Sequence, residues 1–405
     1  MKEITYKLSI TIVALITSLN VSSSDYFEYD GILYFIENKY DREVFVGDNS
    51  ENKNLKTDLK IPAKVIYEGI TYKVTGIGGS AFWKCNLKSV TIPYTIKWLD
   101  GNSFRECKTL ERIDVDDDNP YFCSEGGILY SKDKSVLALY PRTVKGPVTI
   151  PNHVTKIGDL AFESCEGLTS VDIPNSVTEI GIDAFARCYE LTSITIPNSV
   201  TEIGENAFFD CEKLTSATLP ISLTKISSGL FWACSNLSSV NIPNTVTYIG
   251  TWAFGGCKLT SFTIPNTVTK IGKEPLYGNP LTSLYCYATT PPEAQTFSDE
   301  IYSDCILYVP ESCINEYESI DPWRNFFTIK TIESTGIDDV TLSGNITISV
   351  NGGSIKINGI DGNTKVEVYN LSGELVYCGT DNVIQNIPQG VYIVKVNNKS
   401  IKIRL

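Results

Sequence analysis

Apolar and polar residues recur along most of this chain in one fixed order. A representative unit runs from Ile196 to Thr218 and contains an apolar–Pro pair, a polar turn, two apolar positions around a Thr-Glu pair, Gly, Ala-Phe-x-x-Cys and Leu. Residues 193–196 alternate with a period of two, which predicts a short strand, and Pro197 ends it because proline has no N–H for the next ladder. The apolar–Pro pair recurs at Pro62, Pro93, Pro151, Pro174, Pro197, Pro220, Pro243 and Pro265.

The spacing between successive pairs predicts the fold class. From Pro151 onward the pairs lie 22 or 23 residues apart. The gap of 58 residues between Pro93 and Pro151 contains a further unit, with Val115-Asp116 in place of the pair, and divides into 23 and 35. A unit this short cannot bury its apolar side chains alone, so the repeat predicts the stacked turns of a solenoid. Because Ala, Phe and Cys within residues 207–211 have helical spacing, we expect mainly short strands joined by 3-10 or short helical turns.

The 35-residue unit is longer than the others because it contains an insertion near residues 116–147. Asp116–Pro120 has the composition of a turn. Two apolar runs, 127–130 and 136–140, then flank Lys132-Asp133-Lys134. This arrangement predicts a β-hairpin inserted within the solenoid.

The N-terminal residues predict an exported protein. Residues 1–24 read as a signal peptide, since Lys2 and Lys7 precede the apolar stretch Leu8–Leu19 and small residues follow it. The alternative is an N-terminal anchor. We expect no stable membrane span after processing, because no other segment approaches the roughly 18 apolar residues that a spanning helix needs. Residues 25–75 are predicted to be an N-terminal capping region that opens with an antiparallel hairpin and covers the end of the solenoid.

The repeats extend over residues 76–287, and the composition changes after them. Residues 288–332 are predicted to form a C-terminal cap, and residues 333–345 a polar linker. Residues 346–405 contain short apolar runs separated by Gly and Pro turns, which predicts a small all-β sandwich.

Two parts of the chain resemble known families. The motif I-P-x-x-V-T-x-I-G-x-x-A-F-x-x-C-x-x-L-T-S over residues 76–287 resembles the BspA-like leucine-rich repeats of bacterial surface proteins. This resemblance implies a leucine-rich-repeat solenoid and adhesion to host matrix or plasma proteins or to other bacteria. Residues 366–377 and 387–395, with Gly390-Val391-Tyr392, resemble the type A C-terminal sorting domain of the type IX secretion system. The second resemblance implies that residues 346–405 engage the secretion machinery and that the protein is secreted or held on the outer cell surface.

Composition and charge exclude several classes of function. The chain has 34 basic and 47 acidic residues, a formal net charge of −13, which argues against nucleic-acid and anionic-membrane partners. The single histidine, His153, removes multi-His zinc sites and leaves one position for a Ser-His or Cys-His dyad. Other units have Ser or Thr at the position of His153, so we interpret it as an exposed residue of one turn. We therefore predict no catalytic residue, no cofactor and no metal.

The twelve cysteines fall into two groups. Seven recur at one repeat position, three residues after a Phe, and we interpret them as small buried thiols, because zinc sites need Cys-x-x-Cys pairs that this chain lacks. Export through an oxidising compartment favours disulfides among the other five, with the pairing left open. These five are Cys123, Cys286, Cys305, Cys313 and Cys378.

An acidic stretch in the insertion is the one candidate for ion binding or hydrolysis. Asp114, Asp116, Asp118 and Glu125 have the spacing of a calcium loop, but Asn119 stands where that loop requires Gly. We interpret the stretch as a solvated turn. A hydrolase that uses these carboxylates is the less favoured alternative to a binding protein.

Large apolar residues that face outward are the candidate partner-binding residues. Trp83, Phe209 and Trp232 each follow a core Phe directly, and Trp252 precedes Ala253 on the same kind of turn. Because Phe208 faces the core, its neighbour must face outward. The outward positions of the strands are mostly Ser and Thr, which either solvate the sheet or form a second binding face.

The sequence as a whole predicts a non-catalytic protein that binds a protein ligand. Solenoids present long rigid surfaces, and no motif here has the pattern of a reaction centre. The alternative is a structural surface-layer or scaffold protein.

Overall fold

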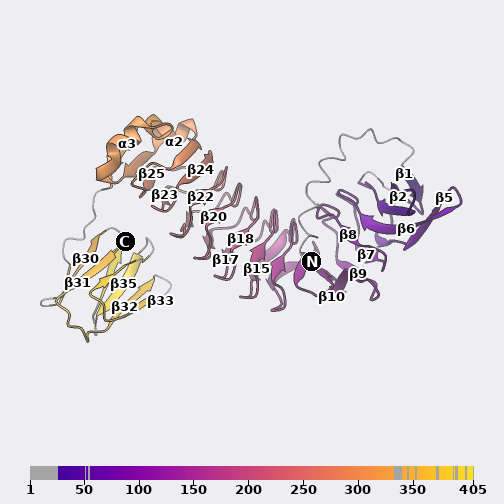
Figure 1. Cartoon of the computed structure of the whole chain (residues 1–405), viewed down its shortest axis with the longest axis horizontal. Coiled ribbons are helices and arrows are strands. Elements are labelled where there is room, and N and C mark those ends of the chain that lie inside the picture. Colours follow the sequence, from indigo (N-terminus) through magenta and orange to yellow (C-terminus); the bar gives the residue numbers. More distant parts are fainter. Residues whose placement is uncertain are drawn as a thin grey trace. The chain divides into compact units, whose positions relative to one another are not determined.

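The computed structural model describes residues 26–404, apart from 51, 53–54, 333–339, 344–345, 352–353, 371–373, 386, 388–390 and 397–398. The predicted signal peptide lies outside the described residues. The chain divides into two compact units, residues 1–192 with 203–214 and residues 193–202 with 215–405, called here the first and the second unit. Both contain stacked β-solenoid turns, which confirms the predicted fold class (Figure 1).

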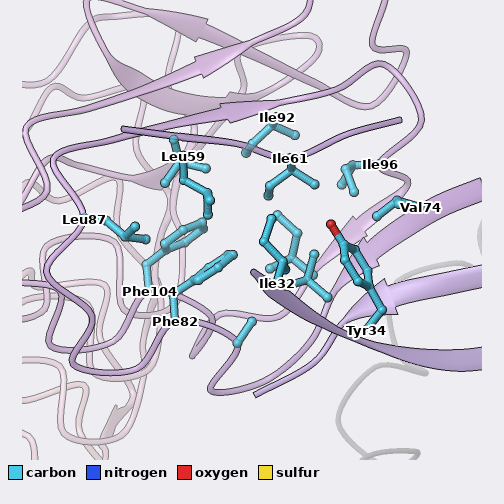
Figure 2. Close-up of a cluster of buried hydrophobic side chains, with 14 of the residues drawn as sticks. Ile32, Tyr34, Leu59, Ile61, Val74, Phe82, Leu87, Ile92, Ile96 and Phe104 are labelled. Atoms are coloured by element: carbon cyan, nitrogen blue, oxygen red, sulfur yellow. The ribbon is translucent and has the colours of Figure 1, made fainter. Parts of the chain in front are cut away.

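The first unit begins with a sheet that covers the first turns. Its strands are β1 (Tyr26–Tyr29), β2 (Ile32–Asn38), β3 (Glu43–Val46), β5 (Lys64–Tyr67) and β6 (Ile70–Ile77), with β8 (Trp98–Leu99) beside β6. β1 and β2 are an antiparallel hairpin that turns at Asp30 and Gly31, both with positive φ. β3 then pairs with β6 in parallel. Figure 2 shows the buried core here, where the stacked rings of Phe82 and Phe104 lie 5.3 Å apart among aliphatic side chains.

Parallel strands of successive turns stack in register in the first unit. These strands are β4 (Asp58–Lys60), β7 (Ser89–Ile92) and β9 (Arg112–Val115), then β13 (Lys145–Thr149) with β15 (Gly167–Asp172), and β14 (Lys156–Ile157) with β16 (Glu179–Ile180). Lys156 lies opposite Glu179, one repeat of 23 residues further along the chain. The register brings Lys156 Nζ to 2.6 Å from Glu179 Oε1.

The insertion contains one strand more than the predicted hairpin. Its strands β10 (Phe122–Glu125), β11 (Ile128–Ser131) and β12 (Val136–Leu139) are antiparallel to one another in order. β12 then pairs in parallel with β14, so the last inserted strand belongs to the stack of turns. After β12 the chain lacks the Ala-Phe-x-x-Cys segment, and the ring of Tyr140 stacks on Phe162 at 4.7 Å in its place.

The second unit has turns of the same kind. Its strands are β17 (Ser193–Thr195), β19 (Ser216–Thr218), β21 (Ser239–Val240), β20 (Lys225–Ile226), β22 (Tyr248–Ile249), β24 (Lys270–Lys273), β26 (Glu293–Thr296), β23 (Ser261–Ile264), β25 (Ser283–Cys286), β27 (Ile306–Val309) and β28 (Thr328–Thr331). β18 (Glu202–Ile203) falls where the chain divides between the units. Ser193 lies opposite Ser216, and Ser216 opposite Ser239, so outward hydroxyls form a straight row.

The Ala-Phe-x-x-Cys segments are tight turns. In the segment around Phe208, Asn206 and Asp210 both have positive φ, 54° and 57°. Left-handed residues four positions apart are incompatible with an α-helix. The backbone is instead hydrogen-bonded from turn to turn, and the N–H groups of Asp183, Phe185 and Arg187 donate to the carbonyls of Glu205, Ala207 and Phe209 over 2.7–2.9 Å. The helices of the described residues all lie between 299 and 325.

The core Phe residues form a ladder inside the turns. Phe162, Phe185 and Phe208 are fully buried, and their ring centroids lie 4.9 and 5.3 Å apart. Near-parallel rings at this spacing bury most of their area against one another. The stack of turns therefore has one continuous aromatic core at this edge.

The seven repeat cysteines are buried thiols, as their position indicates. Cys188 Sγ, for example, donates to the carbonyl of Phe162 one turn earlier at 3.2 Å. In the second unit Asn279 stands at the Cys position, and its side-chain amide donates to the carbonyl of Phe254 at 2.7 Å. The position thus requires a small hydrogen-bond donor. Burial raises the pKa of the Cys107 thiol to about 12, so that this thiol is protonated at neutral pH.

The disulfides expected among the other five cysteines are not formed in the structure. All twelve lie in the described part of the chain, and none of them takes part in a disulfide. Cys286 Sγ lies 3.2 Å from the hydroxyl of Tyr317, and Cys378 is exposed on the last strands of the chain. The sequence alone gave no distances between these thiols, and those distances decide whether a pair can form.

A cap follows the last turns of the second unit. It contains α2 (Asp299–Asp304), the 3-10 helix η2 (Glu311–Cys313), α3 (Ile314–Ser319) and the 3-10 helix η3 (Trp323–Asn325). Figure 1 shows α2 and α3 at the end of the stack that contains β20, β22 and β24. Trp323 is fully buried, its Nε1 donates to the carbonyl of Pro292 at 2.9 Å, and its ring meets Tyr317 edge to face.

The C-terminal residues form two four-stranded sheets that share a core. One has the order β29 (Val340–Ser343), β30 (Ile346–Asn351), β31 (Ser354–Asn358) and β34 (Val383–Ile384); the other has the order β33 (Leu375–Gly379), β32 (Val366–Asn370), β35 (Val391–Val396) and β36 (Lys399–Arg404). Ile348, Ile355, Val368 and Val394 are fully buried between the sheets. β29 lies within residues 333–345, which were predicted to be a linker. The prediction missed this strand because four residues show too little alternation to be recognised in the sequence.

Candidate partner-binding surface

The candidate residues of the first unit are exposed rings that the chain's own cations cover. Trp83 is 37% exposed, and Lys84 Nζ lies 4.3 Å from its ring centroid. Phe209 is half-buried, with the guanidinium of Arg187 at 5.6 Å from its ring centroid. Both distances are within the range of cation–π contacts. A partner that binds these two rings must therefore contact Lys84 or Arg187 as well.

The candidate residues of the second unit form an exposed aromatic pair, Trp232 and Trp252. Their ring centroids lie 5.4 Å apart at an angle of 33°, and each residue is 37% exposed. Gly255 makes room for the pair, since a Cβ at that position would lie 3.3 Å from Trp232 Cδ1 and 3.6 Å from Trp252 Cβ. Trp252 Nε1 donates to Glu274 Oε2 at 3.2 Å, which fixes one edge of the ring. The sequence pattern did not indicate Gly255 or Glu274, because their roles depend on contacts between turns.

A buried charge cluster lies in the first unit, between the turn before the insertion and the turn after it. Glu163 is 0% exposed, and it accepts from Arg187 Nη1 at 3.1 Å and from the backbone N–H of Glu106 at 3.4 Å. Arg105 Nε and Arg142 Nη2 lie 3.7 and 3.9 Å from its carboxylate. Arg142 also donates to the carbonyl of Leu160 at 3.1 Å. Sequence analysis missed this cluster, since its members come from separate turns and from the insertion, and no spacing within one unit brings them together.

The cluster binds together two turns that are not neighbours along the chain. Glu106 and Glu163 are 57 residues apart, and neighbouring turns elsewhere are hydrogen-bonded at separations of about 23. An added Cβ at Gly101 would touch Leu160 Cδ1 at 3.4 Å, so the side chain of one turn also packs on the backbone of the other. Burial raises the pKa of Asp183, whose carboxyl lies near this cluster, although Arg105 and Arg187 act in the opposite direction.

The acidic stretch of the insertion has the surroundings of a solvated turn. Asp114 pairs with Arg112, and Glu125 Oε2 accepts from Lys134 Nζ at 2.7 Å. Asp116 Oδ1 accepts from the backbone N–H of Asp118 at 3.0 Å. Within the described residues, no group of His, Cys, Asp and Glu is arranged to hold a metal ion. His153 is exposed, and its ring meets Tyr130 edge to face.

No helix in the described part of the chain is long and apolar enough to cross a bilayer.

Comparison with known proteins identifies the repeats. The family described as "BspA type Leucine rich repeat region" matches in six copies, over residues 65–124, 146–257 and 224–348. These ranges include well over half of the chain. No curated protein matches it.

Solved structures of leucine-rich-repeat proteins are similar to this chain. A leucine-rich repeat protein from Eubacterium ventriosum is 25% identical with a TM-score of 0.48, over 56% of this chain and 65% of that chain. One from Bacteroides ovatus is 23% identical with a TM-score of 0.40, over 76% of each chain. The pneumococcal vaccine antigen PcpA is 16% identical with a TM-score of 0.39, over 76% of this chain and 98% of that chain.

The chain thus spans less than two thirds of the E. ventriosum protein. The repeat motif, the in-register stacked turns and the six matching copies lead to one conclusion. This chain belongs to the family of BspA-type leucine-rich repeat proteins.

Proposed function

We propose that this protein is exported, displayed on the cell surface and binds a protein ligand without catalysis, as an adhesin for host matrix proteins, plasma proteins or other cells. The observation that carries the proposal is the Trp232–Trp252 pair, two exposed tryptophans from neighbouring turns that pack against each other. Trp and Tyr are enriched at the centres of protein interfaces, because a rigid ring buries a large area at low entropic cost. Family membership supports a binding role.

The proposal includes both ends of the chain. Residues 1–24 act as the signal peptide, and the C-terminal sheets act as the type IX sorting domain that engages the secretion machinery. The structural support is that the C-terminal sheets have a core of their own, with Val366, Val394 and Ile403 buried in it. A compact module of this kind can fold as one unit behind a linker.

The triple change Phe209→Ser, Trp232→Ser and Trp252→Ser is expected to weaken ligand binding strongly. Removal of a central aromatic cluster typically costs at least about 2 kcal/mol, or roughly 30-fold in affinity. The measurement is binding of the purified protein to immobilised plasma proteins, matrix proteins and whole bacterial cells. Tyr40→Ser, at a tyrosine that is 98% exposed near the N-terminus, is the control and should bind normally. Unchanged binding of the triple variant to every ligand found would refute a role for these residues.

Deletion of the C-terminal sheets is expected to stop surface display and leave the protein inside the cell envelope. Because β29 pairs with β30, the deletion begins at Val340, so that no unpaired strand remains. Display is measured by labelling intact cells, and a protease-resistant solenoid in cell extracts serves as the folding control. Normal display of the shortened chain would contradict the sorting assignment and leave the ligand-binding proposal intact.

A further inference from the structure

Trp252 occupies a backbone conformation that suits other residues better. Its φ is +51°, in the left-handed region, where a bulky side chain is an outlier. The same repeat position holds Asn206 in the first unit and Gly229 one turn earlier, with φ of 54° and 63°. Asn and Gly are the residues that tolerate this conformation well. Leu160 holds the same position in the first unit with φ of 58°, so the turn accepts a bulky side chain here, and it is the surroundings of the Trp252 ring that indicate a ligand.

The surroundings of the Trp252 ring combine an aromatic face with a carboxylate. Trp232 packs against it at 5.4 Å, and Gly255 allows this contact, since a Cβ there would lie 3.3 Å from Trp232 Cδ1. Glu274 Oε2 accepts from Trp252 Nε1 at 3.2 Å, so the carboxylate stands at the ring edge. A ring face beside a carboxylate is the arrangement that attracts an ammonium or guanidinium group, by cation–π attraction and by a charge-assisted hydrogen bond.

Elsewhere the chain already pairs rings of this kind with cations. Lys84 lies over Trp83, Arg187 over Phe209 and, in the second unit, Lys225 over Tyr248. Among the described residues, no Lys or Arg is found over the ring of Trp252. A carboxylate oxygen of Glu274 stands at the edge of that ring, and Trp252 is 37% exposed.

We propose that Trp252, with Trp232 and Glu274, binds a lysine or arginine side chain that projects from a basic segment of the protein partner. The inference rests on the proposed function and names the chemistry of the partner. The excess of 47 acidic over 34 basic residues favours approach of a basic segment, since long-range attraction raises the encounter rate.

The test uses the full chain and two short peptides, hexaarginine and hexacitrulline, which have similar shapes and differ in charge. Isothermal titration is expected to show binding of hexaarginine and none of hexacitrulline. Trp252→Asn should weaken hexaarginine binding about tenfold, because it removes the ring. Its melting temperature should not fall, because Asn suits the left-handed position. Glu274→Gln should also weaken binding, since the neutral amide keeps the shape and loses the charge.

Two controls separate a specific site from general attraction to an acidic protein. Glu300→Gln, at an exposed residue of α2, removes the same charge from the cap and should leave hexaarginine affinity unchanged. Tyr40→Asn removes an exposed ring elsewhere and should also have no effect. Equal weakening by Glu300→Gln and Glu274→Gln would overturn the proposal.

Two further outcomes would also overturn it, namely full affinity in Trp252→Asn and equal binding of hexacitrulline. If the triple serine variant loses ligand capture and either of these outcomes is also seen, the surface binds a ligand but not through a cationic side chain. The proposed function would then remain, and this inference would fail. Unchanged capture by the triple variant would remove the binding role of the surface itself.

Discussion

Replacing Glu163 by Ala is expected to lower the free energy of unfolding by about 3–5 kcal/mol. The change removes the carboxylate from the buried charge cluster and leaves Arg142, whose side chain is 0% exposed, without its counter-charge. An uncompensated buried charge is far more costly than the loss of a surface ion pair. The measurement is the urea midpoint of the full chain, followed by far-ultraviolet circular dichroism.

The matched control for this prediction is Glu190→Ala. Glu190 pairs with Lys213 at 2.7 Å on the surface, and its loss should cost about 0–1 kcal/mol. High salt should remove the effect of Glu190→Ala and preserve that of Glu163→Ala, because buried pairs are poorly screened. If both variants lose the same stability, Glu163 is not a buried anchor between turns.

Replacing Trp323 by Ala is expected to cost about 3–5 kcal/mol and to open the C-terminal cap. The change leaves a cavity among Tyr317, Phe297 and Phe326, whose rings all contact the indole. It also leaves the carbonyl of Pro292 without its donor. The strands β27 and β28 should then become accessible to protease. Limited proteolysis is therefore expected to cut the variant within residues 299–332 faster than it cuts the unchanged protein.

Phe327→Ala is the control within the same cap. Phe327 is 80% exposed, and its truncation should change stability by no more than about 0.5 kcal/mol. Trp323→Phe should fall between the two, since it keeps a ring and loses the hydrogen bond to Pro292. A Trp323→Ala variant as stable and as protease-resistant as Phe327→Ala would show that the cap does not depend on this side chain.

The fold class could be predicted from the sequence because the same pattern of apolar and polar residues recurs many times. One unit alone, such as residues 196–218, is ambiguous, but a fixed spacing of about 23 residues admits few architectures other than stacked turns. The conformation of the Ala-Phe-x-x-Cys turns could not be predicted this way. Their spacing fits a helical turn, whereas Asn206 and Asp210 are left-handed and the segment between them accepts hydrogen bonds from a neighbouring turn.

The candidate surface could be predicted only in part. The outward direction of Trp232 follows from its place beside the core residue Phe231, which is a local rule. The support of Trp252 by Gly255 and Glu274 depends on side chains from different turns, and no spacing within one unit shows it. The charge cluster around Glu163 could not be predicted for the same reason, because it forms only where two turns that are distant in the sequence come into contact beside the insertion.

That direct contact between distant turns has a consequence for cooperativity. In an ideal solenoid each turn contacts only its two neighbours, so unfolding can proceed one turn at a time along the stack. Around Glu163 the turn before the insertion and the turn after it share an ion pair, a hydrogen bond and side-chain contacts, in addition to what each shares with the inserted turn. None of the three can detach without disturbing the other two. The insertion is the least regular part of the repeat array. We expect it to unfold together with the turns on either side of it, as one cooperative unit.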